Sequence, residues 1–112
     1  MAYKGEQLTH TFVAGEDLSG DQYSAVYIDA DGTIYNDDNT GARAFLGILQ
    51  DKPESGQAGV VCLMGITKVA VSGSTATGSA LSAGSTPYEV GIVLDGTGAA
   101  GVATALVTHV AA

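Results

Sequence analysis

The stretch that decides the fold is Phe45-Leu46-Gly47-Ile48-Leu49-Gln50-Asp51, followed after a polar turn by Gly56-Gln57-Ala58-Gly59-Val60-Val61-Cys62-Leu63-Met64-Gly65-Ile66-Thr67-Lys68-Val69. Short apolar runs bounded by Gly, Pro and Asp are typical of strands. Pro53 and Gly56 mark the turn, because proline cannot donate to a strand ladder and glycine eases a tight turn. The stretch therefore predicts two or three tightly joined strands, and none of its residues forms a catalytic motif.

Alternating or continuous apolar residues predict strands over residues 8–13, 22–28, 33–35, 44–50, 58–64, 66–71, 88–94 and 102–110. The run 58–64 is nearly continuously apolar, so both of its faces are expected to be buried, and Gly65 is expected to mark a bend or bulge after it. Asp31-Gly32 lies between two of them and predicts a hairpin. Residues 72–86 are rich in Ser, Gly, Ala and Thr and fit either a loop or a short strand around Leu81, and the last segment also fits a short helix. We expect an all-β fold, a compact single-domain β-barrel or sandwich of about seven to nine short strands.

Length and charge narrow the classes of function. The 112 residues suit one domain, which we place over residues 11–112 behind an extended N-terminal arm of residues 1–10. The net charge is −8 with four basic residues, so we expect neither nucleic acid nor an anionic membrane surface as a partner. Ten of the twelve acidic residues lie at or before Glu54. The simpler interpretation is that the solvated acidic half keeps the protein soluble, and the alternative is that the nearly neutral half faces protein partners.

The cysteine count and the termini indicate a protein made in a reducing cytoplasm. Cys62 is the only cysteine, so no internal disulfide can form, and its apolar neighbours predict a buried thiol. The first residues lack the apolar core of a signal peptide, and no run of 18 apolar residues predicts a membrane span.

Three patterns resemble chemical sites but lack their context. Gly96-Thr97-Gly98-Ala99-Ala100-Gly101 has dinucleotide-loop spacing, but the eleven residues that follow cannot supply the rest of a βαβ unit. Residues 29–38 begin like a calcium loop, yet Thr33, Ile34 and Thr40 stand where an EF-hand needs an oxygen ligand, Gly and Glu. Whether these residues bind a cation by another geometry stays open.

Cys62, His10 and His109 have neither zinc-ligand nor nucleophile spacing. We therefore expect no catalytic residue, no metal ligand and no cofactor, and we expect that the chain is not an enzyme.

Residues 23–71 resemble the small capsid decoration, or cement, proteins of tailed bacteriophages. The resemblance lies in Gly32, in Phe45-Leu46-Gly47-Ile48-Leu49, in Ser55-Gly56, and in residues 60–71 around Met64-Gly65-Ile66, with a similar apolar run after Gly91. It covers about two-thirds of the chain. It implies a homotrimer on the outer surface of the virion, synthesised in the host cytoplasm, that binds and bridges major capsid protein subunits without an active site or cofactor.

Two segments are the candidate contacts under this interpretation. Because termini are commonly free until bound, we expect an arm to pair with a strand edge of a capsid subunit, with contact residues Ala2, Tyr3, Lys4, Gln7 and Leu8. Small side chains allow close approach between protomers, and the candidates for that contact are Ser74, Thr77, Leu81 and Thr86.

A different class of function remains open beside the capsid interpretation. A carbohydrate-binding or adhesin-like β module would stack exposed aromatic rings on sugars, and the available rings are Tyr3, Tyr23, Tyr27, Tyr35 and Tyr88, without any Trp. A small hydrolase or isomerase would need a pocket with groups of shifted pKa, which the sequence does not indicate.

Overall fold

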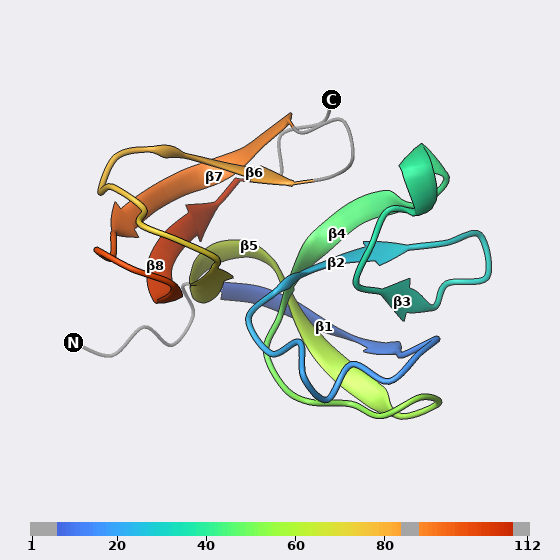
Figure 1. Ribbon diagram of the computed structural model, residues 1–112. Helices are drawn as coiled ribbons and strands as arrows, with labels where there is room; N and C mark the ends of the chain where they lie inside the picture. The colour runs from blue at the N-terminus through green and yellow to red at the C-terminus, as the bar shows by residue number, and fades with distance from the viewer. Residues whose placement is uncertain (1–6, 84–87, 109–112) are drawn as a thin grey trace.

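The computed structural model describes residues 7–83 and 88–108, which form eight strands and one short 3-10 helix (Figure 1). The helix is η1 (Asn39–Gly41). The strands are β1 (Gln7–Val13), β2 (Ala25–Ile28), β3 (Ile34–Tyr35), β4 (Ala44–Leu49), β5 (Ala58–Val71), β6 (Ala80–Ala83), β7 (Tyr88–Asp95) and β8 (Gly101–Val107). The prediction of a compact all-β domain is confirmed, and the last segment is a strand rather than a helix. None of the helical structure in these residues is long and apolar enough to cross a membrane.

The strands form one antiparallel sheet in the order β3-β2-β4-β5-β8-β7-β6, and β1 pairs with β5 beside this path. The sheet curls into a half-barrel, with β1 to β4 on one side and β6 to β8 on the other (Figure 1). The long strand β5 belongs to both sides. Its first half pairs with β1 and β4, and its second half pairs with β8.

Gly65 is the point at which β5 exchanges one neighbour for another. It lies opposite both Gln7 of β1 and Val107 of β8, and its φ is +118°. Glycine adopts this conformation without the steric penalty of other residues. The bend predicted at Gly65 is therefore a change of partner inside a continuous 14-residue strand.

Adjacent residues of a strand point to opposite faces of the sheet, so β4 contributes side chains to two separate apolar clusters. Ile48 belongs to the first cluster, on the concave side, with Tyr27, Phe45, Val69, Val90, Ala105 and Val107. Leu49 belongs to the second, together with Ala14, Leu18, Val26, Ile34 and Val61. Burying about ten medium-sized apolar side chains at ~2 kcal/mol each is the main stabilising contribution in a domain of this size.

The hairpin predicted at Asp31-Gly32 is present between β2 and β3. The amide of Gly32 donates to the carbonyl of Asp29 at 3.1 Å, and the amide of Asp29 donates to the carbonyl of Thr33 at 3.1 Å. Gly32 has a φ of +83°, the left-handed conformation that such a loop requires.

Two predictions from the sequence differ from the structure, one on where the first strand begins and one on burial. β1 begins at Gln7, so residues 7–10 of the expected arm belong to the sheet; the Gln7 side-chain amide also donates to the Ile66 carbonyl at 2.7 Å. Residues 58–64 were expected to be buried on both faces, but Met64 is exposed and Leu63 is half-buried.

Candidate binding surfaces

The residues expected to bind a capsid subunit fall into two groups. Gln7 and Leu8 lie in β1, where they pair with Gly65 and Met64 of β5. Leu8 keeps 57% of its surface exposed, and Met64 keeps 47%. Ala2, Tyr3 and Lys4 lie outside the described residues. The structure therefore places Leu8 in an exposed apolar position, held by backbone pairing within its own chain.

The residues expected to join protomers are also separated. Ser74 and Leu81 line the same hollow on the concave side of the sheet. The hydroxyl of Thr77 instead accepts a hydrogen bond from the amide of Gly96 at 3.0 Å, which ties its loop to the turn after β7. Thr86 lies outside the described residues. The structure does not gather Thr77 with Ser74 and Leu81 into one patch.

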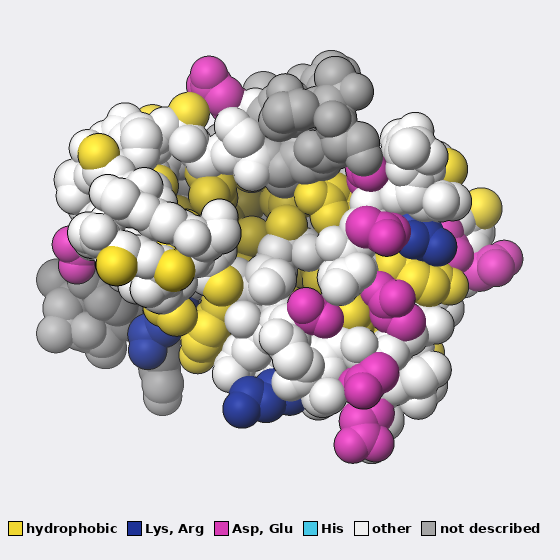
Figure 2. All heavy atoms as spheres, in the orientation of Figure 1, with side chains coloured by type: hydrophobic (Ala, Val, Ile, Leu, Met, Phe, Trp, Pro, Cys, Tyr) yellow, Lys and Arg dark blue, Asp and Glu magenta, His cyan; other side chains and the backbone are white. Residues whose placement is uncertain are grey.

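This hollow lies on the concave face, between the two sides of the half-barrel (Figure 2). It has a volume of about 380 Å³, and apolar side chains from β4, β5 and β7 line it, among them Phe45, Ile48, Val69 and Val90. Ser72, Ser74, Thr75 and Ser82 are the hydroxyl-bearing residues of its lining. Figure 2 shows this apolar floor between the two sides of the half-barrel. No described charged residue lines the hollow, so it suits an apolar group and offers no acid–base pair.

The opposite, convex face carries an uncovered apolar surface. Along β8, Ala103, Ala105 and Val107 are buried, whereas the alternate residues Val102, Thr104 and Leu106 face outward. The register places Ile66 of β5 and Ile92 of β7 on either side of Leu106. Ile92 is 47% exposed and Val102 is 52% exposed. Two shallow grooves that meet at Leu8 and Met64 continue this surface toward β1.

The acidic residues gather on the other part of the molecule. Figure 2 shows most of the Asp and Glu side chains over the β1 to β4 side, and few over β6 to β8. From Ile66 onward the sequence holds only Glu89, Asp95 and Lys68 as charged residues. The charge asymmetry of the sequence is therefore also an asymmetry of the folded surface.

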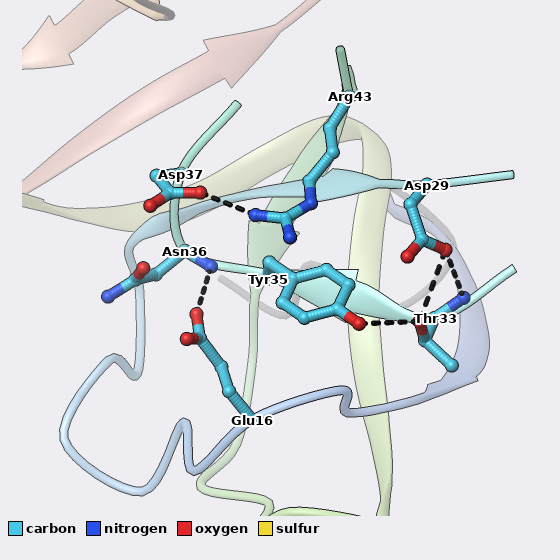
Figure 3. Close-up of polar contacts among 7 residues, drawn as sticks. All are labelled: Glu16, Asp29, Thr33, Tyr35, Asn36, Asp37 and Arg43. Carbon is cyan, nitrogen blue, oxygen red and sulfur yellow. Dashed lines mark hydrogen bonds and ion pairs between the residues drawn. The ribbon is translucent and has the colours of Figure 1, made fainter. Parts of the chain in front are cut away.

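Polar contacts on the acidic side organise the loops around β3 (Figure 3). The Arg43 guanidinium lies 3.6 Å from the centre of the Tyr35 ring and donates to the Asp37 carboxylate at 2.6 Å. The Glu16 carboxylate accepts a hydrogen bond from the amide of Asn36 at 2.9 Å. These contacts fasten the β1–β2 and β3–β4 connections to each other.

Asp29 uses its carboxylate inside its own hairpin. One oxygen accepts hydrogen bonds from the Asp31 amide, the Thr33 amide and the Thr33 hydroxyl, at 3.0, 3.3 and 3.1 Å. Desolvation would raise the pKa of Asp29, but these hydrogen bonds outweigh it and hold the pKa below its ordinary value. No group of three His, Cys, Asp or Glu side chains in the described residues has the geometry to hold a metal ion. The cation site considered for residues 29–38 finds no support.

Cys62 is a buried core thiol, as predicted. Its Sγ donates to the Met64 carbonyl at 3.3 Å, and burial raises the pKa of the thiol. His10 is exposed on β1, and its ring meets the Phe12 ring edge-on at 5.1 Å between centroids. The hydrogen bond of Cys62 and the ring contact of His10 are the kind of contacts that structural side chains make.

Sequence reasoning missed the convex apolar face. A signal was present in β8, where Val102 and Leu106 alternate with Ala103 and Ala105, but the sequence alone does not show which of the two sets points outward. In the tightly curled sheet the inner side of β8 has room for Ala103 and Ala105, so Val102 and Leu106 face outward.

Comparison of the sequence with family models and with curated proteins gives no relative from which a role can be inferred. No protein-family model matches the chain. No curated protein has a significantly similar sequence.

Proposed function

We propose that this chain is a non-enzymatic decoration protein, which binds the outer surface of a tailed-phage head and stabilises it by bridging major capsid protein subunits. One observation carries the proposal: apolar side chains are uncovered on the convex face, away from the acidic side of the domain. An exposed apolar patch is typical of a surface that binds another protein. The capsid as partner comes from the sequence resemblance.

The division of the surface suits a particle-bound protein. The acidic side stays hydrated and repels other acidic chains, while the neutral face is free of the charges that oppose apolar contact. A single contact of this size is weak. Several identical contacts made at once raise the avidity about a hundredfold or more without any new contact, which favours a symmetric assembly such as a trimer.

Co-sedimentation with empty, expanded heads of the phage or prophage that encodes the chain tests the proposal. We expect saturable binding at a fixed ratio of chains to capsid subunits, and an increase in the temperature at which the heads rupture. Absence of binding to these heads contradicts the proposal. Deletion of residues 1–6 should weaken binding and leave the circular dichroism spectrum unchanged; undiminished binding contradicts the role of the arm.

The carbohydrate-binding alternative has a weaker basis. Tyr27 is buried, and Arg43 covers one face of the Tyr35 ring. Tyr23 is half-buried, with the Lys68 ammonium 5.9 Å from the centre of its ring. Tyr27 is thus withdrawn from a sugar, and Tyr35 and Tyr23 each have a cationic side chain of their own chain over the ring. A glycan array separates the two functions, because selective glycan binding supports the alternative.

A further inference from the structure

We propose that the convex face of β5, β8 and β7 is a weak two-fold contact between two copies of this chain. The face consists of cross-strand rows, since residues directly opposite each other in a sheet point to the same side. One row is Ile66, Leu106 and Ile92. The next row is Lys68, Thr104 and Asp95, and Asp95 reaches Thr104 across a bulge in β7 that also contains the exposed Leu94. This face is the one proposed above to bind the capsid, so on any one copy the self-contact and capsid binding exclude each other.

The second row makes this face complementary to itself. Lys68 and Asp95 lie on opposite sides of Thr104, two strand spacings or about 10 Å apart, and these two described residues form no ion pair within one chain. A two-fold axis that runs along β8 between two facing sheets exchanges the β5 side with the β7 side. It therefore places Lys68 of each copy opposite Asp95 of the other, and Ile66 of each copy opposite Ile92 of the other.

The charges of the chain also favour this face for self-association. Two copies with a net charge of −8 repel each other most strongly through their β1 to β4 sides, where the acidic residues gather. In the second row of the convex face, the positive charge of Lys68 balances the negative charge of Asp95. The Lys68 ammonium now leans toward Tyr23, and its long stem allows it to turn toward a partner's carboxylate.

The size of the face sets the strength of the contact. Three strands about 4.8 Å apart and about seven residues long cover roughly 350 Å² in projection, less than half of the ~800 Å² that each partner buries in a standard interface. We therefore expect a dimer that is populated at hundreds of micromolar and dissociates on dilution.

Sedimentation velocity from 10 µM to 2 mM tests the contact. We expect the mass to rise toward two copies, and Ile92→Glu should abolish the rise. Val13→Glu is the matched control. The exposed fraction of Val13, 45%, is similar to the 47% of Ile92, but Val13 lies at the far end of β1. A monomer at 2 mM, or equal behaviour of the two variants when circular dichroism shows both folded, overturns the proposal.

A charge exchange gives the sharper test. Asp95→Lys lowers the net negative charge by two, so general repulsion alone predicts tighter association, whereas the proposed pairing predicts at least threefold weaker association. The double variant Lys68→Asp with Asp95→Lys keeps the net charge and should restore association to within twofold of the original chain. Tighter association of the single variant, failure of the double variant to recover, or a trimer that survives Ile92→Glu contradicts the two-fold contact.

Discussion

Replacing Gly47 by alanine should be among the most damaging single-methyl additions to this fold. A Cβ built on Gly47 lies 2.1 Å from the carbonyl oxygen of Cys62 and 2.9 Å from Cγ1 of Val61. Ordinary carbon–oxygen contacts are more than 3 Å, so β4 and β5 would have to separate by about 1 Å next to the paired residues Ile48 and Cys62. The obstacle is backbone, and no side-chain rotation relieves it.

The expected loss is at the upper end of the overpacking range, about 3 kcal/mol, because both apolar clusters meet at β4. In a domain of this size that corresponds to a decrease of roughly 12 °C in Tm. Urea unfolding followed by circular dichroism measures it. Gly20→Ala is the control, since nothing lies within 4 Å of its Cβ and its φ is not positive. A Gly47→Ala loss below about 1 kcal/mol would refute the reasoning.

Three further outcomes are expected. Arg43→Ala should lower the free energy of unfolding by about 1 kcal/mol in urea titrations, through loss of the Tyr35 stack and the Asp37 pair; an unchanged midpoint contradicts this. The pKa of Asp29 is lower in the folded chain, so its stabilisation is present above about pH 4 and disappears as the pH falls further; Asp29→Asn should flatten the Tm profile between pH 5 and 3. Cys62 should react with a thiol reagent at pH 8 many times more slowly in the native chain than in urea, and equal rates refute its burial.

Local sequence signals predicted most of the strands because they depend on neighbouring residues. Alternation defined β2 and β8, and Asp31-Gly32 defined the β2–β3 hairpin. The order of the strands could not be predicted in this way. Pairing of Gln7 with Gly65 joins residues far apart in the chain, and no local pattern encodes that partner.

The surfaces were harder to predict than the strands. The charge asymmetry was visible in the sequence because most acidic residues precede Glu54. The sequence did not show which face of each strand points inward. Both faces of β8 are apolar, and only the curl of the sheet decides that Ala105 points inward and Leu106 outward. The contact residues Ser74 and Thr77 were chosen by composition, which does not report where a loop is anchored.

The pairing of β1 with β5 also has a consequence during synthesis. Gln7 bonds to Ile66, which lies 59 residues later in the chain. At about 5–20 residues per second, a ribosome leaves β1 without its partner for roughly 3–12 s. An unpaired apolar strand invites aggregation over that interval, but the centre of β1 is Thr9-His10-Thr11. The polar middle of this strand therefore protects the nascent chain before β5 emerges.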